Sequence, residues 1–346
     1  MAYRRAVVSP APLLLVPGLD DDLLRVEKAM VDSVKAGDPF LTEVASHLIT
    51  AGGKRLRPAL AVAVGRLAPG CDGSVSEDVI MGGVAVELVH LGSLYHDDVM
   101  DEARTRRNVE SVNARWGNLV AILAGDFLLA RASEIAASLG TEVAGLLAAT
   151  IGRLCEGQVR ELAQTFDVSR SEESYLLSIA GKTASLMSTA CRIGAITSGF
   201  PRDGVDAFTD FGQQVGMVFQ IVDDILDVVA TDEELGKPAG NDMMEGVYTL
   251  PVIRALAADS PASGSGDDLR KLLGNPLSGG EVDEARSLVK ANGAVTAAIG
   301  VARGYAVRAS QAFDSVAVPT NGGWAQGPVA VALRSLGDDL IENLPS

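Results

Sequence analysis

The residues best suited to chemistry are two clusters of three aspartates with the same spacing. They are HDDVMD, with Asp97, Asp98 and Asp101, and QIVDDILD, with Asp223, Asp224 and Asp227. On a helix, Asp97 and Asp101 would project from one face, one turn apart. Their carboxylates would repel each other unless a cation lay between them. A sparse set of hard oxygen ligands suits magnesium, which keeps coordination positions for water and phosphate oxygens.

An acidic exposed turn is the alternative interpretation of either cluster alone. The second cluster, however, lies inside an apolar run from Val215 to Val229, where a solvated helix face would not place three acids. Each cluster also ends a long apolar helical pattern. Two motifs with matching spacing in this setting indicate a site for magnesium and diphosphate.

Cationic residues are clustered in the same way. They are Lys54, Arg55 and Arg57 in GGKRLRP, Arg106 and Arg107 after the first aspartate cluster, Lys182 in AGKTASL, and Lys237 in GKPAGND. One planar guanidinium group can bind two phosphate oxygens at once, so this set of cations favours diphosphates over nucleobases. The formal net charge of -16 also disfavours nucleic-acid binding. For Lys182 alone, an ordinary surface cation is the simpler interpretation.

Helices are expected to position these groups, because Ala, Leu, Glu and Arg dominate the long segments and strand-favouring clusters are scarce. The expected helices are 20–35, 41–51, 57–67, 76–100, 115–139, 142–165, 172–198 and 204–230. The helix over 76–100 is apolar on most sides, as a buried central helix would be. Loops are expected at 236–241, 258–267 and 321–327, with weaker and shorter helices filling the remainder. We therefore predict an all-α protein, with an amino-terminal extension over residues 1–20 and one helical bundle domain over residues 21–346.

The cysteines and the amino terminus predict a soluble protein of the reducing cytoplasm. Cys71, Cys155 and Cys191 are an odd number without CxxC spacing, which disfavours a disulfide scaffold and a zinc site. Arg4 and Arg5 precede a short apolar run, but prolines interrupt it and no typical cleavage site follows, so a signal peptide is not expected. No other stretch of about 18 uncharged apolar residues occurs, so we expect no membrane span.

A different metal chemistry has to be considered, because Glu87 and His90 form an ExxH pair with His96 nearby. Helical bundles that bind two iron or manganese ions use two such pairs and two further glutamates. Only one ExxH pair occurs in this sequence, and the aspartate clusters are not part of that pattern. The di-metal class is therefore disfavoured.

Five motifs follow one another along the chain: GGKRLRP, HDDVMDEARTRRN, GKTASL, FQIVDDILD and GKPAGNDMMEGVYTLP. In this combination the chain resembles the trans-isoprenyl (polyprenyl) diphosphate synthases over roughly residues 40–255. The resemblance implies an all-helical bundle with a deep central cavity, and a homodimer. It also implies a Mg²⁺-dependent prenyltransferase, with three ions per site, that condenses isopentenyl diphosphate head-to-tail with an allylic prenyl diphosphate.

The resemblance further assigns roles to single residues. The ligands of magnesium on the allylic diphosphate would be Asp97, Asp101 and Asp223, supported by Asp98, Asp224 and Asp227. The cations that hold the same diphosphate would be Arg106, Lys182 and Lys237. The residues that bind isopentenyl diphosphate would be Lys54, Arg57, His90 and Arg107. The groups beside the developing allylic cation would be Thr183 and Gln220.

Gly92 and Ser93 bear on the length of the product. They lie five and four residues before Asp97, a rise of about 6–7.5 Å along a helix. In short-chain members of the family, bulky residues at these positions block the growing chain. Both residues are small here, so the resemblance implies a medium- or long-chain synthase whose product is longer than geranylgeranyl. Such a product would be handed to membrane enzymes.

Two departures from the family pattern stand out. Val247 occupies a position where many relatives have lysine, so one diphosphate contact is missing, and Asn108 replaces a glycine that often follows the arginine pair. Two alternative classes would differ from this sequence in specific motifs. A silent subunit of a two-component synthase would lose one aspartate cluster or the arginine pair. A terpene cyclase or head-to-head condensing enzyme would change the second cluster and need no GGKRLRP site. This sequence keeps all of these features, which favours active prenyl-chain elongation.

Overall fold

Helices make up nearly all of the regular structure in the described residues. The computed structural model describes residue 13 and residues 16–71, 73–235, 238–257, 265–291, 293–316 and 327–345. Within these ranges the strands are β1 (Thr105–Arg106) and β2 (Val109–Glu110), which form one short antiparallel hairpin. The prediction of an all-α fold is confirmed.

The elements have the following bounds. The helices of the first half of the chain are α2 (Leu19–Ser33), α3 (Pro39–Thr50), α4 (Leu56–Arg66), α5 (Glu77–Met100), α6 (Val112–Trp116), α7 (Asn118–Ser138) and α8 (Thr141–Leu162). Those that follow are α9 (Glu172–Ile179), the π-helix η1 (Ala180–Ala184), α10 (Ser185–Thr197), α11 (Arg202–Val229), α12 (Asp232–Leu235) and α13 (Asn241–Met244). The last are α14 (Leu250–Ala257), α15 (Ser265–Leu272), α16 (Gly279–Ala291), α17 (Ala294–Asp314) and α18 (Pro328–Glu342).

The structure differs from the expected elements in three places. The helix expected over 115–139 is divided between α6 and α7 at Gly117, whose φ of 89° ends the first of them. The helix expected over 172–198 contains η1. The prediction of only short, weak helices in the remainder was wrong, because α17 has 21 residues. The loops expected at 236–241, 258–267 and 321–327 lie partly or largely outside the described residues.

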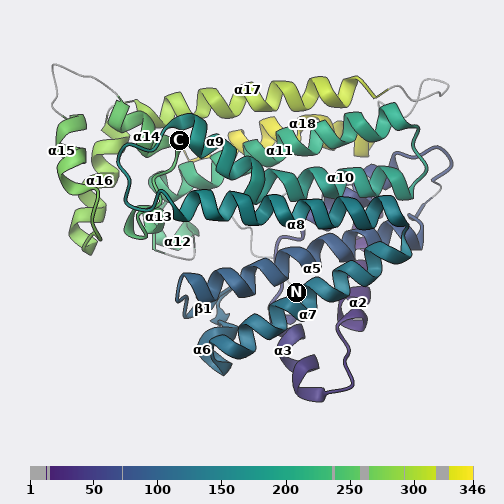
Figure 1. The fold of residues 1–346 in the computed structure, drawn as a ribbon. Coiled ribbons are helices and arrows are strands. Elements are labelled where there is room, and N and C mark those ends of the chain that lie inside the picture. Colours follow the sequence, from purple (N-terminus) through teal and green to yellow (C-terminus); the bar gives the residue numbers. More distant parts are fainter. Residues whose placement is uncertain are drawn as a thin grey trace.

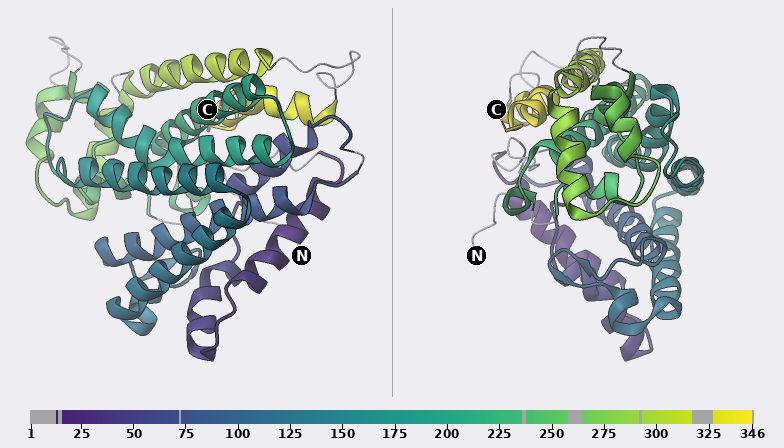
Figure 2. Two further views of the ribbon diagram at one scale, coloured as in Figure 1. Left: turned by 45° about the vertical axis from the view of Figure 1, so that its right-hand side comes forward. Right: turned by 90° about the vertical axis from the view of Figure 1, so that its left-hand side faces the viewer.

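The long helices pack around α5 and α11, which carry the aspartate clusters. α8, α10 and α11 run side by side, α17 covers α11, and α5 and α7 cross beneath them (Figure 1). α5 also packs against α4 and α10, while α15 and α16 form a pair at one end of the bundle (Figure 2). This arrangement places the carboxyl-terminal end of α5 below the layer that contains α8 and α11.

α5 is buried on most sides, as its apolar sequence predicts. The hydroxyl of Ser76 accepts a hydrogen bond from the Val79 amide and caps the helix. Among the described residues, α5 is the helix long and apolar enough to span a membrane, but 72% of that apolar window is buried inside the bundle. α5 is therefore a core helix of the bundle.

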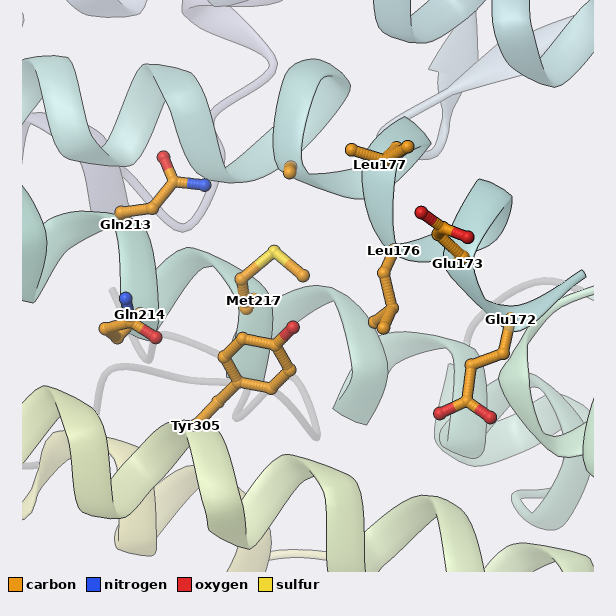
Figure 3. A pocket seen from close by; sticks show the side chains of 9 residues that line it. Glu172, Glu173, Leu176, Leu177, Gln213, Gln214, Met217 and Tyr305 are labelled. Carbon is orange, nitrogen blue, oxygen red and sulfur yellow. The ribbon is translucent and has the colours of Figure 1, made fainter.

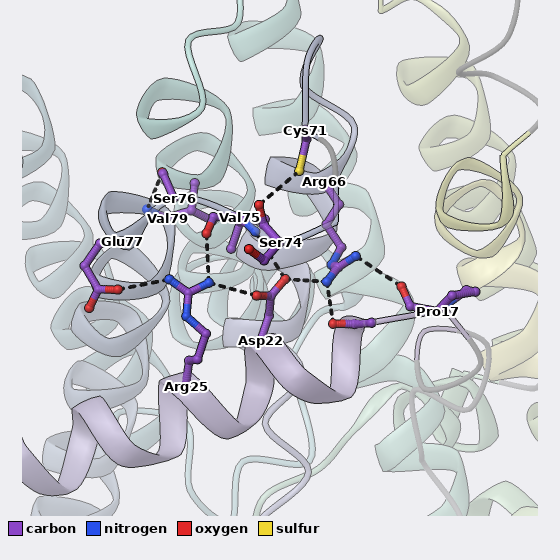
Figure 4. Close-up of polar contacts among 11 residues, drawn as sticks. Pro17, Asp22, Arg25, Arg66, Cys71, Ser74, Val75, Ser76, Glu77 and Val79 are labelled. Carbon is purple, nitrogen blue, oxygen red and sulfur yellow. Dashed lines mark hydrogen bonds and ion pairs between the residues drawn. The ribbon is translucent and has the colours of Figure 1, made fainter.

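A buried carboxylate fastens α2 to the bundle (Figure 4). Asp22 is fully buried, and its two oxygens lie 2.6 Å from Nη2 of Arg66 and 2.9 Å from Nη1 of Arg25. Arg25 also donates to the Val75 carbonyl and to Glu77, at the start of α5. The contacts join α2 to α4 and α5. Because a buried charge is tolerated only when paired, Asp22 requires both arginines.

Candidate active site

The first aspartate cluster lies at the end of α5. Asp97 is partly exposed, whereas Asp98 is buried. Oδ1 of Asp98 accepts a hydrogen bond from Nε of Arg106 at 2.7 Å and lies 2.6 Å from Nη2 of the same arginine. Burial raises the pKa of Asp97 to about 6; Lys182 opposes the shift and Asp101 adds to it. Burial also raises the pKa of Asp101. Crowded, partly desolvated carboxylates of this kind gain stability when a cation neutralises them.

The β1–β2 hairpin follows this cluster and aims the two arginines in different directions. Arg107 and Asn108 form its turn with φ of 55° and 63°, the left-handed conformation of a two-residue hairpin turn. Asparagine tolerates this conformation better than most residues, so Asn108 can stand where relatives have glycine. Arg106 turns toward Asp98, while Arg107 donates to the carbonyls of Leu48 and Gly52.

The GGKRLRP segment holds one of its cations buried and another exposed. Arg55 is buried and binds Glu27 through Nε and Nη2 at 2.5 and 3.1 Å, and Glu87 through Nη1 at 3.0 Å. Arg55 therefore anchors the loop. Glu87 is committed to this pair, which argues further against a di-metal role for its ExxH motif. Lys54 is exposed, with its Nζ 5.7 Å from the ring centre of Phe219 on α11.

The other residues expected to bind isopentenyl diphosphate come together beside Glu87. Burial lowers the pKa of Arg57 to about 10; Glu87 raises it and Arg107 lowers it. Burial, with the charges of Arg57 and Arg107, holds the pKa of His90 well below its usual value. His90 is thus neutral beside two guanidinium groups, and can donate a hydrogen bond without adding charge.

Lys182 lies on η1 and binds a carboxylate that the sequence did not single out. Its Nζ is 2.5 Å from Oε1 of Glu161, on α8. Burial lowers the pKa of Lys182, but Glu161, Asp97 and Asp101 outweigh this effect and raise it. The ammonium group therefore stays charged between α8 and the end of α5.

The second aspartate cluster is organised by a chain of buried hydrogen bonds. The Thr183 hydroxyl donates to Oε1 of Gln220 at 2.6 Å, and Nε2 of Gln220 donates to Oδ1 of Asp224 at 2.8 Å. The Tyr175 hydroxyl donates to Oδ2 of Asp224 at 2.6 Å. Burial raises the pKa of Asp224 to about 7, although the bonds from Tyr175 and Gln220 oppose the shift. Asp223 itself is only partly buried.

Electrostatic neighbours connect the two clusters. Glu161 raises the pKa of Asp101, on α5, and that of Asp224, on α11. Lys182, bound to Glu161, acts on Asp97 and Asp101. The Lys182–Glu161 pair therefore acts electrostatically on carboxylates of both DDxxD motifs. Sequence analysis missed Glu161 and Tyr175, because a single acid in a long helix and a single tyrosine in an apolar pattern carry no spacing signal.

The remaining expected residues are Lys237, Ser93 and Gly92. Lys237 lies outside the described residues. Ser93 lies about 40° from Asp97 around the axis of α5, given 100° per residue, and is partly exposed. Gly92 lies on another side, where an added Cβ would be 3.1 Å from the Gly125 carbonyl oxygen. Its small size is therefore required by close packing of α5 on α7.

The donor set fits magnesium that is shared with a diphosphate. Among the described residues, no three acids, histidines or cysteines form a ready-made metal site. The aspartates instead offer separate oxygens on facing helices, and Oδ2 of Asp98 is buried without a hydrogen-bond partner. Asp227 accepts from the Asp242 amide at 3.2 Å, which ties the second cluster to α13. Sparse oxygen ligands completed by phosphate and water are typical of magnesium.

A surface recess of about 580 Å³ lies elsewhere, between α9, α11 and α17 (Figure 3). Its lining includes Glu172, Leu176, Met217 and Tyr305. None of the aspartates of the two clusters lines it. The printed lining of the recess contains no cation that would hold a diphosphate.

Comparisons with known proteins show the family to which this chain belongs. The sequence model of the polyprenyl synthetase family matches residues 38–289. The nonaprenyl diphosphate synthase of Mycobacterium tuberculosis is 41% identical over 286 residues, which cover 82% of this chain and 84% of that protein. Heptaprenyl diphosphate synthase component 2 of Geobacillus stearothermophilus is 41% identical over 241 residues, covering 69% of this chain and 74% of that protein.

A solved structure shows the same fold. It is a polyprenyl synthase from Caulobacter crescentus in complex with calcium and isoprenyl diphosphate, with a TM-score of 0.83 and 32% identity, over 98% of this chain and 99% of that chain. The family resemblance seen in the sequence motifs is confirmed. This chain belongs to the polyprenyl synthetase family.

Proposed function

We propose that this protein is a Mg²⁺-dependent prenyltransferase that condenses isopentenyl diphosphate head-to-tail with an allylic prenyl diphosphate. The product would be a trans-polyprenyl diphosphate longer than geranylgeranyl. The observation that carries the proposal is that η1 connects the two DDxxD motifs: Lys182, bound to Glu161, acts on the charges of Asp97 and Asp101, and the next residue, Thr183, is linked through Gln220 to Asp224. The calcium and isoprenyl diphosphate named for the Caulobacter structure support this choice of ligands.

The site would act mainly by positioning and by charge. Magnesium, with three ions per site held through Asp97, Asp101 and Asp223, would neutralise the allylic diphosphate as it departs. Lys182 and Arg106 would hold the same group, together with Lys237. The aligned dipoles of Thr183 and Gln220 would stabilise the allylic cation next to them.

The second substrate would be held by the cations around Glu87. Arg57, Arg107 and Lys54 would bind isopentenyl diphosphate, and neutral His90 would donate a hydrogen bond to it. Fixing the two substrates in one orientation makes formation of the carbon–carbon bond effectively intramolecular. The departing diphosphate can accept the final proton, so no separate base is required.

The direct test is incubation of the protein with magnesium, isopentenyl diphosphate and farnesyl diphosphate, followed by chromatography of the dephosphorylated products. We expect prenyl alcohols longer than geranylgeraniol. Asp223→Ala should abolish turnover while the circular dichroism spectrum stays helical. Failure to elongate any allylic primer would refute the proposal. A product that ends at geranylgeranyl would refute only the length assignment.

Ser93 provides a separate test of product length. Because Ser93 lies near Asp97 around α5, Ser93→Phe should obstruct the growing chain and shorten the main product by one or more isoprene units. Product chromatography measures the change. Ser133→Phe, at an exposed position of α7, is the control and should leave the length unchanged. An unchanged product from Ser93→Phe would show that the chain grows past another face.

A second candidate follows from two relatives, each of which is named component 2 of a heptaprenyl diphosphate synthase. This chain would then need another polypeptide for activity. The purified protein alone decides between the candidates: unaided elongation supports the leading proposal. We place either form in the cytoplasm, with the apolar product passed to membrane enzymes.

A further inference from the structure

Arg170, between α8 and α9, has a buried guanidinium group with unused hydrogen-bond donors. Only 5% of the residue is exposed. Its Nη1 donates to the Tyr248 carbonyl oxygen at 3.0 Å. Its Nε and Nη2 are also buried, and neither has a hydrogen-bond partner among the described residues. Buried donors are nearly always paired. The edge of the guanidinium group formed by Nε and Nη2 of Arg170 therefore requires a partner that the described chain does not supply.

The same edge is occupied in other arginines of this protein. Nε and Nη2 contact Glu27 in Arg55, at 2.5 and 3.1 Å. They contact Asp98 in Arg106, at 2.7 and 2.6 Å. In Arg334, on α18, both nitrogens donate to an aspartate at 2.8 and 2.5 Å. In Arg55 the two nitrogens contact two oxygens of the carboxylate, and in Arg106 and Arg334 they contact a single one. In each case the edge binds a carboxylate, so an oxyanion is the expected partner of Arg170.

The position of Arg170 indicates which oxyanion. Burial lowers the pKa of Arg170, and the charges of Glu161 and Asp224 oppose the shift. Its guanidinium carbon lies 5.6 Å from the ring centre of Tyr175, which donates to Asp224. Arg170 therefore lies beside the Lys182–Glu161 pair and the second aspartate cluster, but comes from a different segment of the chain.

The neighbouring carboxylates are already engaged. Both oxygens of Asp224 accept hydrogen bonds, from Gln220 and Tyr175. Glu161 binds Lys182 at 2.5 Å. Neither carboxylate bonds to Nε or Nη2 of Arg170. The missing acceptor is therefore not among the residues that the structure describes.

Val247 stands where many relatives have a lysine, so this chain lacks a cation that Arg170 can replace. Nη1 of Arg170 binds the carbonyl of Tyr248, the residue next to Val247, and consecutive Cα atoms are about 3.8 Å apart. We propose that the Nε–Nη2 edge of Arg170 binds oxygens of the allylic diphosphate beside Lys182, and supplies a positive charge that Val247 does not. This inference rests on the proposed function and adds to it a diphosphate-binding residue.

The test is calorimetric titration of inorganic diphosphate, with magnesium, into the full-length protein. Arg170→Gln should weaken binding at least about tenfold, because it removes a charged two-point contact. Arg170→Lys keeps the charge and one donor, and should weaken binding several-fold. In turnover assays, the KM for the allylic diphosphate should rise while that for isopentenyl diphosphate stays the same.

Two further variants separate this role from a structural one. Val247→Lys, introduced into the Arg170→Gln protein, should restore most of the diphosphate affinity by placing an ammonium nearby. Arg254→Gln is the matched control: its Nε is likewise buried and unpaired, but its Nη2 binds Glu172, and diphosphate affinity should not change. Thermal melting checks that each variant is folded.

The possible outcomes are distinct. Wild-type affinity in folded Arg170→Gln or Arg170→Lys would overturn the inference and leave water as the partner of this edge. A wild-type protein that binds magnesium and diphosphate but elongates no primer would refute the proposed function. In that case the comparison of Arg170 with Arg254 would still decide whether Arg170 binds diphosphate.

Discussion

Asp97 shows at the scale of one residue how a catalytic site can reduce stability. Burial raises its pKa from an ordinary value of 3.8 to about 6, and Asp101 adds to the shift. The folded protein thus binds this proton more tightly than the unfolded chain does. Ionising Asp97 therefore lowers the free energy of unfolding, progressively from about pH 4 to pH 6, and the loss persists above that range.

Asp97→Asn should therefore stabilise the metal-free protein while it abolishes turnover. In EDTA at pH 8 the variant should melt at a higher temperature than the wild type. The difference should shrink as the pH falls through about 6 and disappear near pH 4. Thermal melting across this range measures it, with Asp338→Asn, at an exposed position of α18, as the control. A lower melting temperature for Asp97→Asn at pH 8 would contradict the sign of this argument.

The sequence specified residues with repeated spacing better than residues that act singly. The aspartate clusters were predictable because spacing and an apolar setting coincide. The different roles of Arg55 and Arg57 could not be predicted, because both are arginines. Only the turn of the backbone directs Arg55 inward to Glu27 and Glu87. Glu161 likewise acquires its role only when α8 is packed on η1.

At the scale of elements, η1 depends on a close approach of two backbones. A Cβ added at Gly157, on α8, would lie 2.5 Å from the Lys182 amide nitrogen and 2.9 Å from the Ser178 carbonyl oxygen. Single π-turns of this kind are frequent at functional sites. Here the π-turn carries Lys182 and Thr183 at the point where α8 and η1 touch.

Gly157→Ala should consequently separate α8 from η1, because backbone atoms cannot yield as a flexible side chain does. Turnover should fall by about a hundredfold if Lys182 moves by about 1 Å, while the helical spectrum is retained. Gly300→Ala, on α17, is the matched control, since no atom lies within 4 Å of its added Cβ. Initial rates with saturating substrates measure the effect. Near-normal turnover of Gly157→Ala would mean that this contact does not set the site.

At the scale of the whole molecule, composition and periodicity predicted the class of fold but not every element. The apolar patterns of α5 and α11 gave their bounds to within two residues. The length of α17 was missed because it buries alanines, such as Ala298, Ala302 and Ala306, which give a weak periodic signal. The β1–β2 hairpin was missed because two-residue strands have no period. Close helix packing at small residues could not be predicted either, because it depends on which helix packs against them.

The outer faces of α7 and α8 extend the argument to assembly. Leu119 and Leu123, on α7, are 72% and 57% exposed, and Val159, on α8, is 65% exposed. Large apolar side chains that gather on two adjoining helices are typical of an interaction surface. We propose that these helices pair with a second copy of the chain in a homodimer, as the family resemblance implies.

Leu119→Glu combined with Leu123→Glu should therefore convert the protein to monomers. Twofold symmetry places each new charge on both sides of the interface. Sedimentation velocity at micromolar concentration measures the change. Leu24→Glu is the control, because Leu24 is 66% exposed but lies on α2, so its variant should remain dimeric. A wild type that sediments as a monomer, or a double variant that sediments as a dimer, would contradict the assignment. Because Val159 and Glu161 belong to the same helix, loss of the dimer should also lower turnover by loosening the support of Lys182.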